Sequence, residues 1–351
     1  MISFNKLKPA LLEEMTEGEI VKCLKELSQA FTQSRHKIDD VYASPKHISS
    51  YASFYLPTNM YKMAFLLKQL PNELIEGIKN STVVEVGTGP GTYLFGLLEE
   101  LNCEMTSFIG VDHSPLMLKQ AEKIHQSLYP CSDITWRSDI PKLPGRKTYI
   151  FGNSLNEMGH YTGLKLVNRN KADIVICIEP GTKSSFKEMS SFRSGMIKDG
   201  YKVIYPCSGE GECPIIKLDE DDWCHQVVRT KLDDSIERLS QLIKLDRKTM
   251  PAIIHVYTKD KVENNRKYQV VRLVKNIKHA FLWEVCFEDA GEMKLVRIEL
   301  MKKIYKKKEV KALESMSTGY EIDFTIDKKI ESNHWRVKLT PEVLEKIVNK
   351  K

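Results

Sequence analysis

Residues 83–92 read VVEVGTGPGT, an apolar strand-like run that leads into a loop with glycines at positions 87, 89 and 91. Glycines this close together let the backbone turn sharply and approach a ligand, which then meets the N-terminus of the helix-like segment TYLFGLLEEL. The dinucleotide-binding fingerprint spaces its glycines as GxGxxG. Here the spacing is GxGxG, with Glu85 two residues before the first glycine, and this favours S-adenosylmethionine (SAM) over NAD.

The sequence around this loop predicts a parallel α/β sheet. From Thr82 onward, the apolar runs TVVEVG, SFIGVD, KTYIFG and DIVICIEP alternate with helix-length segments. In open α/β sheets, ligands bind at the carboxyl ends of the strands, where Asp112 is placed to accept ribose hydroxyls. Taken singly, each residue is also explained by a tight loop or a helix cap. The predicted cofactor-binding residues are Glu85, Gly87, Thr88, Gly89, Gly91, Asp112, Asp139 and Asn153.

The remaining chain predicts additions to this sheet. The N-terminal segment has apolar residues at helical spacing, and the chain beyond Tyr201 is irregular before it gives the strand-like runs AIIHVYT, KYQVVRLV and AFLWEVCFE. We expect an α/β class I SAM-dependent methyltransferase fold, which is Rossmann-like with a doubly wound, mostly parallel sheet. The predicted parts are an N-terminal helical region (1–75), a SAM-binding domain (76–260) with a Cys-rich metal loop at 205–226, and a β-rich basic C-terminal extension (261–351).

Composition and charge limit the function classes. Hydrophobic residues make up 42% of the 351 residues and charged residues 28%, and no apolar run is long enough to cross a bilayer. The N-terminal segment mixes acids and bases without an apolar core, so we expect the protein to be cytoplasmic. We also expect a monomer that does not bind membranes. The net charge is +6, but residues 266–311 hold 13 basic and 6 acidic residues, so the positive charge is concentrated near the C-terminus.

The cysteines indicate a metal site. Cys207, Cys213 and Cys224 fall within the Gly- and acid-rich stretch YPCSGEGECPIIKLDEDDWCHQ, which has no CxxC or HxxxH pair. Irregular spacing is compatible with an iron-sulfur cluster, whose fourth thiolate must come from elsewhere. In FLWEVCFE, Cys286 lies on the strand face opposite the aromatic and apolar residues. His225 offers a Cys3His zinc site instead, and the residues alone leave iron-sulfur and zinc open.

Several segments together resemble a known family, the mitochondrial small-ribosomal-subunit methyltransferase-like proteins and their bacterial relatives. The resemblance runs from Tyr51 to Tyr320 and rests on YASFYLPT, EVGTGPGT, EPGT and the Cys-rich stretch ending in DWCH, with Cys286 also fitting. Where the family usually has Pro-His after the first cysteine, this chain has Ser208 and Gly209. The resemblance implies that a [4Fe-4S] cluster is held by Cys207, Cys213, Cys224 and Cys286.

The resemblance also implies action on, or together with, the small ribosomal subunit and its RNA during ribosome assembly and translation, with SAM as cofactor. The Lys-rich stretch at 302–311, with Tyr305 among its lysines, would supply phosphate contacts, although composition alone favours a solvated charged face. Two alternatives remain: a catalytically inactive assembly factor that keeps the cofactor fold, and a small-molecule methyltransferase with a structural zinc.

No catalytic residue is assigned from the sequence. A class I methyltransferase works chiefly by holding the methyl group and the nucleophile in line, so it needs few catalytic side chains. The segment after the expected fourth strand reads GNSLNEMGH and lacks the Asn-Pro-Pro-Tyr tetrad typical of amine substrates. Asn153, Asn156 and Glu157 face the expected methyl position, and Glu157 is a possible proton acceptor.

Overall fold

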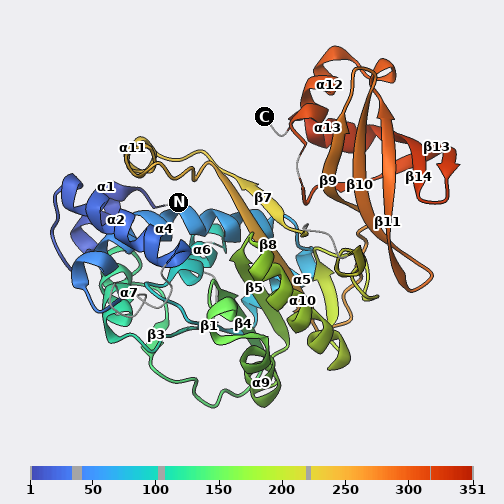
Figure 1. Cartoon of the computed structure of the whole chain (residues 1–351). Coiled ribbons are helices and arrows are strands. Elements are labelled where there is room, and N and C mark those ends of the chain that lie inside the picture. The colour runs from blue at the N-terminus through green and yellow to red at the C-terminus, as the bar shows by residue number, and fades with distance from the viewer. Residues whose placement is uncertain (1, 34–41, 102–106, 219–222, 317, 350–351) are drawn as a thin grey trace. The chain divides into compact units, whose positions relative to one another are not determined.

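A computed structural model describes residues 2–33, 42–101, 107–218, 223–316 and 318–349 (Figure 1). The chain divides into two compact units, and each is described by itself. Unit 1 comprises residues 1–179 and 228–250, and unit 2 comprises 180–227 and 251–351. The units cut across the predicted ranges 1–75, 76–260 and 261–351, because the predicted metal loop at 205–226 belongs to the same unit as Cys286.

Unit 1 contains the predicted parallel sheet. Its strands follow the order β3-β2-β1-β4-β5, and every neighbouring pair is parallel, with Val84 of the central strand opposite Ile109 on one side and Tyr149 on the other. This order, in which the chain starts in the middle and winds outward in both directions, is that of doubly wound folds and confirms the class I methyltransferase fold. The strands are β1 (Thr82–Val86), β2 (Ser107–Val111), β3 (Ile134–Arg137), β4 (Lys147–Gly152) and β5 (Ile174–Pro180).

Helices connect β1 to β2, β2 to β3 and β4 to β5, as the alternating sequence pattern predicts, whereas β3 is joined to β4 by an irregular segment. The Ser114 hydroxyl caps the helix after β2 by accepting a hydrogen bond from the Met117 amide (3.4 Å), and Pro115 occupies the first turn, where a missing N–H costs nothing. The connecting helices are α6 (Thr92–Leu101), α7 (Pro115–Leu128), α8 (Leu155–Met158) and α9 (His160–Asn170).

The N-terminal segment is helical, as predicted, and packs with a helix from the second segment of unit 1. One apolar cluster joins Leu24 and Leu27 to Phe54 and to Ile236 and Leu239. Unit 1 is therefore closed by residues that are more than 180 positions apart in the chain. The helices are α1 (Phe4–Leu7), η1 (Lys8–Ala10), α2 (Glu17–Thr32), α4 (Pro45–Leu67), α5 (Asn72–Lys79) and α11 (Asp234–Ile243).

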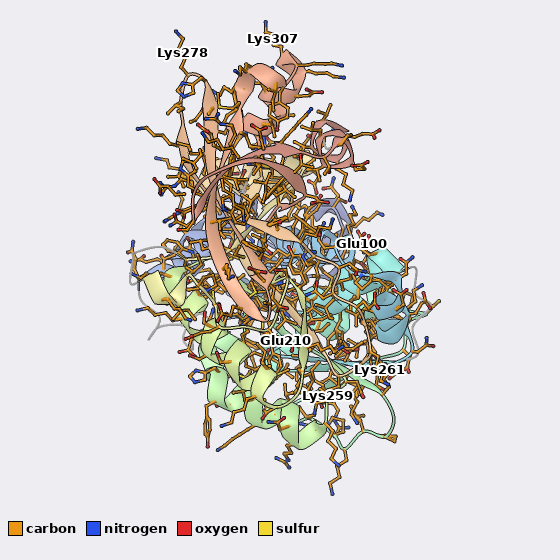
Figure 2. The ribbon with its side chains drawn as sticks, turned by 90° about the vertical axis from the view of Figure 1, so that its right-hand side faces the viewer. Glu100, Glu210, Lys259, Lys261, Lys278 and Lys307 are labelled. Atoms are coloured by element: carbon orange, nitrogen blue, oxygen red, sulfur yellow. The ribbon has the colours of Figure 1, made fainter. Side chains whose placement is uncertain are left out.

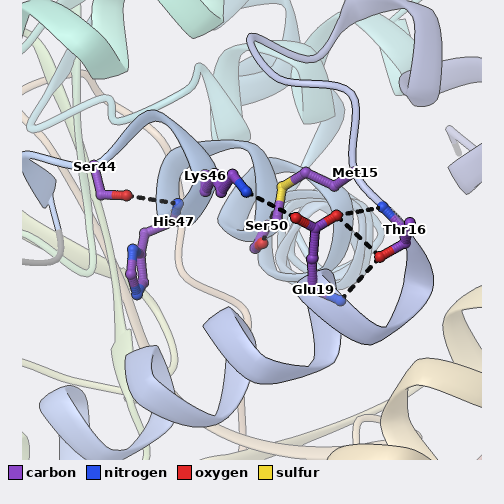
Figure 3. A network of polar contacts seen from close by, with 7 residues as sticks. All are labelled: Met15, Thr16, Glu19, Ser44, Lys46, His47 and Ser50. Carbon is purple, nitrogen blue, oxygen red and sulfur yellow. Dashed lines mark hydrogen bonds and ion pairs between the residues drawn. The ribbon is translucent and has the colours of Figure 1, made fainter.

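Polar contacts fix where α2 and α4 begin (Figure 3). Thr16 and Glu19 form a capping box, in which the Glu19 amide donates to the Thr16 hydroxyl (3.3 Å) and the Thr16 amide donates to the Glu19 carboxylate (3.0 Å). Lys46 on α4 pairs with the same carboxylate at 2.7 Å, and Ser44 caps α4 by accepting from the His47 amide (3.5 Å). The two helix starts are thus tied to each other.

Unit 2 begins with a helix and short strands. Within it, β6 pairs antiparallel with β8. The Cys-rich segment follows β6, and its described residues, 206–218 and 223–225, are irregular apart from one short 3-10 helix. These elements are α10 (Lys183–Lys198), β6 (Lys202–Tyr205), η3 (Ile216–Leu218), β7 (Gln226–Arg229) and β8 (Thr249–Thr258), the last two of which cross the boundary between the units.

The rest of unit 2 is a half-barrel built on a six-stranded sheet of order β12-β9-β10-β11-β14-β13. Phe281, Trp283 and Val285 point into its core, as the strand pattern predicted, and α12 and α13 contribute Leu313 and Val343. The two edge strands are consecutive in the chain, so the sheet must curl. The elements are β9 (Tyr268–Asn276), β10 (Ala280–Asp289), β11 (Glu292–Met301), η4 (Lys302–Ile304), α12 (Lys307–Glu314), β12 (Glu321–Ile322), β13 (Phe324–Glu331), β14 (His334–Leu339) and α13 (Pro341–Asn349).

None of the helices in the described ranges is long and apolar enough to span a membrane.

Candidate cofactor site and cysteine cavity

The glycine loop adopts a backbone that requires glycine. Gly87, Gly89 and Gly91 have φ angles of 71°, 53° and 89°, a left-handed region that side-chain-bearing residues rarely adopt. A Cβ on Gly87 would lie 2.5 Å from the Cβ of Ser154, and one on Gly91 would lie 2.6 Å from the Phe95 ring. The loop is therefore shaped by both its backbone and its neighbours, and it leads directly into the start of α6.

Glu85 holds this loop together. Its buried carboxylate accepts hydrogen bonds from the Thr88 hydroxyl (2.8 Å) and from the amides of Tyr93 (3.2 Å) and Leu94 (3.1 Å). Burial raises the pKa of Glu85 to about 8, although these hydrogen bonds act in the opposite direction. Both Glu85 oxygens are thus used by the loop and the first turn of α6, and its direct contact with a cofactor stays a prediction.

Asp112 lies at the end of β2, next to the loop. One of its carboxylate oxygens accepts from the Gly89 amide and the other from the Ser114 amide, both at 2.8 Å. The carboxylate is thereby fixed beside the loop, and each oxygen keeps a second lone pair for a ribose hydroxyl. Asp139, by contrast, is exposed, and its nearest partner is Arg137 at 3.4 Å.

The end of β4 is strained and contains unpaired acceptors. Asn153 has a φ of 58°, which is unusual for a residue with a side chain. Its side-chain nitrogen Nδ2 donates a hydrogen bond to the Tyr93 hydroxyl at 3.2 Å. Within the described ranges, the side-chain oxygens of Asn153 and Asn156 and one oxygen of Glu179 are buried without a hydrogen-bond partner. Such groups are rare in folded proteins, and a bound water, ion or ligand can complete their bonding.

Glu179 at the end of β5 belongs to the same region. Its other oxygen accepts from the Leu155 amide at 2.8 Å, which fixes the chain just after β4. Burial raises the pKa of Glu179 to about 8. Glu157, predicted as a possible proton acceptor, is exposed, and its charge acts on Glu179 and Tyr51.

A second set of polar residues in unit 1 escaped sequence analysis. Arg247 donates to the Thr58 hydroxyl (3.0 and 3.1 Å) and to the Asn59 side-chain oxygen (2.6 Å), and it lies 5.5 Å from the Tyr55 ring centre. Lys62 is buried on the same helix, α4, and burial lowers its pKa to about 7. Tyr55 and Thr58 belong to the stretch YASFYLPT. That stretch was therefore a sequence signal for this set, but nothing in it pointed to Arg247.

Unit 2 brings the four predicted metal ligands together. Cys207, Cys213, Cys224 and Cys286 all line one small cavity. All four are free thiols. Cys177, by contrast, is fully buried in β5 of unit 1, as expected of a small hydrophobic residue, and is not part of the lining. The structure thus separates these four cysteines from the incidental ones, although their spacing in the sequence is irregular.

Hydrogen bonds hold the Cys-rich segment against the half-barrel. The Glu288 amide at the end of β10 donates to the Ser208 hydroxyl, and the Glu210 amide donates to the Glu288 carboxylate, both at 3.0 Å. Asn264 and Arg266 donate to the carbonyls of Cys207 (2.8 Å) and Pro206 (3.1 Å). Ser208, which follows the first of the four cysteines, thus has a structural partner.

One buried cation lies in the cavity lining. Arg193 is 3% exposed and donates to the Gly209 carbonyl at 2.8 Å, while its Nε has no hydrogen-bond partner among the described residues. Burial acts to lower the pKa of Arg193, but the nearby Cys207, Tyr257 and Cys213 outweigh it and raise that pKa. Burial also raises the pKa of the Cys213 and Cys286 thiols. The positive charge of Arg193 therefore lies where it would stabilise cysteine thiolates in the cavity.

The Lys-rich stretch lies on η4 and α12. Its lysines are exposed, except that Lys302 is partly buried, with its ammonium 2.6 Å from the Asn276 side-chain oxygen and 4.5 Å from the Phe281 ring centre. Tyr305, expected among the phosphate contacts, is instead part of the half-barrel core, and its hydroxyl accepts from the Leu339 amide at 3.1 Å. An aromatic residue among lysines was here a core residue, so that expectation was wrong.

Solved structures of methyltransferases are similar to this chain at low identity. Magnesium protoporphyrin IX methyltransferase from Synechocystis, with bound SAM, is 11% identical over 70% of this chain and 98% of that chain, with a TM-score of 0.38. A putative RNA methyltransferase from Pyrococcus horikoshii is 12% identical over 57% of this chain and 83% of that chain, with a TM-score of 0.34. With scores this low, the fold assignment rests on the strand order and the loop.

A comparison with protein families is more specific. The chain matches the family described as mitochondrial small ribosomal subunit Rsm22 over residues 45–309, a range that includes the glycine loop and all four cavity cysteines. A search of curated proteins finds no match. Because the family match covers well over half of the 351 residues, the chain belongs to the Rsm22 family.

Proposed function

We propose that this protein binds SAM in unit 1, holds a [4Fe-4S] cluster in unit 2, and acts on the RNA of the small ribosomal subunit. The observation that carries the proposal is the pairing of two sites in one chain of the Rsm22 family: a left-handed glycine loop beside Asp112, and four cysteines around one cavity.

The cofactor site favours an adenosyl ligand. The three loop glycines give the left-handed backbone of a tight loop, and Asp112 is fixed beside them by the Gly89 amide. Bound SAM would supply an electrophilic methyl group. The chain's part is to position it: Glu85 keeps the loop in shape, and the unpaired oxygens at the ends of β4 and β5 are placed to accept hydrogen bonds from an amino group of the cofactor or substrate.

The spread of the sulfurs favours a cluster over zinc. A tetrahedral zinc, with Zn–S bonds of about 2.3 Å, holds its sulfurs within about 4 Å of one another. Among the described residues, three potential ligand atoms lie within 4.8 Å of one another at Cys23, Glu26 and His47. The four cavity cysteines do not form such a group. Four thiolates that each bind a different iron suit the wider arrangement.

Iron content tests the cluster. After anaerobic purification we expect about four irons and four sulfides per chain with a broad visible absorption band. Cys286→Ser should lose them, whereas Cys177→Ser, a cysteine outside the cavity, should keep them. A colourless protein with one zinc would overturn the cluster and leave the SAM site unaffected.

A methyl-transfer assay tests the hypothesis that the protein is an active methyltransferase. We expect the protein with labelled SAM to methylate purified small-subunit RNA. Binding of SAM and RNA without transfer would instead support the alternative of an assembly factor that keeps the fold as a binding module.

The family description names a mitochondrial subunit, whereas the sequence suggested the cytoplasm. Imaging of the tagged full chain decides between the two compartments.

A further inference from the structure

The half-barrel of unit 2 has a specific connectivity. Strands β9, β10 and β11 form an antiparallel meander, α12 follows, and β14 then lies parallel to β11. Strands β12 and β13 are separated only by Asp323, yet β12 pairs with β9 and β13 with β14. They therefore act as one bent strand that bridges the first and last strands.

This connectivity is that of an OB-fold. If β12 and β13 count as one strand, the barrel has five strands in the order 1-2-3-5-4-1, with a helix between the third and fourth. OB-folds are Greek-key barrels that bind oligonucleotides on the face of strands 2 and 3 and on the loops between strands 1 and 2 and between strands 4 and 5. In this chain those strands are β10 and β11. Because a fold alone does not establish function, the face itself must supply the chemistry.

The outer face of the barrel carries a row of arginines. Glu284 on β10 lies directly between Arg272 on β9 and Arg297 on β11, and it pairs with them at 2.5 and 3.4 Å. One step along, Glu299 on β11 faces Arg336 on β14 and pairs with it at 2.8 Å. The two carboxylates are 9% and 11% exposed, whereas the arginines are 29%, 46% and 37% exposed. The carboxylates hold the guanidinium groups in place and leave them accessible.

The loop between β9 and β10 extends this positive face. The loop includes Lys278 and His279 and follows Lys275 near the end of β9, and no acidic residue occurs from position 268 to 283. The Lys302 amide donates to the His279 carbonyl at 2.8 Å, which brings the start of the Lys-rich stretch to the same end of the barrel. Figure 2 shows Lys278 and Lys307 projecting into solvent at that end.

We propose that this face, defined by Arg272, Arg297, Arg336, Lys275 and Lys278, binds single-stranded RNA through its phosphates. The inference rests on the proposed function, which supplies RNA as the partner, and it names the RNA class and the surface. In the described part of the barrel, the exposed large apolar side chains are aliphatic: Leu273, Val274, Ile304, Ile326 and Ile330. Without exposed aromatic rings for base stacking, recognition rests on the backbone and has little sequence preference.

The test measures RNA binding by the full chain. The probe is a fluorescein-labelled single-stranded RNA of about 12 nucleotides, within the range that OB-folds cover, and anisotropy is measured at several salt concentrations. Lys275→Gln with Lys278→Gln removes two charges from the face. Lys198→Gln with Lys202→Gln is the matched control, since both lysines are exposed on α10 and β6. Thermal unfolding checks that each variant is folded.

The expected result is a loss confined to the face variant. Two lost phosphate contacts on a single strand should reduce the slope of log K against log salt by about 1.4 and weaken binding about tenfold, with the control unchanged. Arg297→Gln should also weaken binding, because it removes a positive charge from the face. The barrel should stay folded in this variant, because Arg272 still neutralises Glu284. A duplex RNA of the same length should compete poorly.

Other outcomes would overturn the inference in distinguishable ways. Wild-type binding that is lost in Lys307→Gln with Lys308→Gln but kept in the face variant would move the RNA to α12 and leave the proposed function intact. Preference for duplex RNA, or binding only to a ribosomal protein, would refute the single-stranded assignment. If the wild-type chain binds none of these RNAs at low salt, the proposed RNA partner fails together with the inference.

Discussion

Replacing Gly87 with alanine tests whether the loop depends on both backbone and space. Gly87 has a φ of 71°, and an added Cβ would lie 2.5 Å from the Cβ of Ser154. Ser154 cannot easily retreat, because its hydroxyl donates to the Val86 carbonyl at 2.6 Å, just before the loop. We therefore expect Gly87→Ala to displace the loop and to destabilise unit 1.

The magnitude divides into two parts. A left-handed backbone costs an alanine about 1–2 kcal/mol relative to glycine. Steric overlap in a packed region adds about 1–3 kcal/mol. Gly145→Ala isolates the first part, since Gly145 has a φ of 70° but no atom within 4 Å of an added Cβ. The total for Gly87→Ala is thus about 2–5 kcal/mol, against about 1–2 kcal/mol for Gly145→Ala.

Urea denaturation and calorimetric titration with SAM measure the two effects. Gly87→Ala should lower the free energy of unfolding more than Gly145→Ala does, and it should weaken SAM binding at least about tenfold, which corresponds to about 1.4 kcal/mol. Gly145→Ala should bind SAM normally. Equal losses of stability in the two variants, together with unchanged SAM affinity, would refute the claim that Ser154 and the loop are packed as described.

Three further changes test other parts of unit 1. Asp112→Asn should weaken SAM binding about tenfold in calorimetric titration and lower the free energy of unfolding by about 1–3 kcal/mol, because an amide keeps only one of two acceptors and leaves the Gly89 or Ser114 amide without its partner; unchanged SAM affinity would exclude a ribose contact. Since burial raises the pKa of Glu179 to about 8, its contribution to stability is full below about pH 4.5 and is lost as the pH rises toward 8. In urea denaturation, Glu179→Gln should therefore gain stability relative to wild type between about pH 5 and 8, and a flat difference would contradict this. Arg247→Ala should lower the free energy of unfolding by about 2–4 kcal/mol, because it leaves Asn59 and Thr58 buried without their donor; a loss of stability no larger than that of Arg238→Ala, an exposed arginine, would contradict it.

Local patterns predicted the sheet and the loop. The strands of unit 1 are short apolar runs, and the three loop glycines have the left-handed backbone that their spacing suggested. The role of Glu85 was not predictable, because spacing alone does not show that its carboxylate turns back onto Thr88 and the first turn of α6. Sequence placed it near a ligand; the structure makes it a support of the loop.

Long-range contacts account for the features that sequence analysis missed. Arg247 donates a hydrogen bond to Thr58, which is 189 positions away in the chain, and no local sequence pattern predicts such a contact. The runs KYQVVRLV and AFLWEVCFE predicted strands, but the barrel depends on β14 lying parallel to β11 and on the bend at Asp323, which are properties of pairing. The four cysteines, likewise, were grouped by resemblance and are gathered by the fold around one cavity.

The interrupted layout of unit 1 has a consequence for synthesis on the ribosome. Residues 228–250 supply α11 and Arg247, which cover α2 and α4, and they leave the ribosome only after the whole stretch 180–227 of unit 2. Until then, Leu24, Leu27 and Phe54 lack their apolar partners Ile236 and Leu239. Nascent chains that end before α11 begins at Asp234 thus expose an apolar helical surface, which is the kind of aggregation-prone intermediate on which chaperones act. A stop codon at position 228 should therefore give an aggregating product, even though the sheet of unit 1 is complete by residue 180.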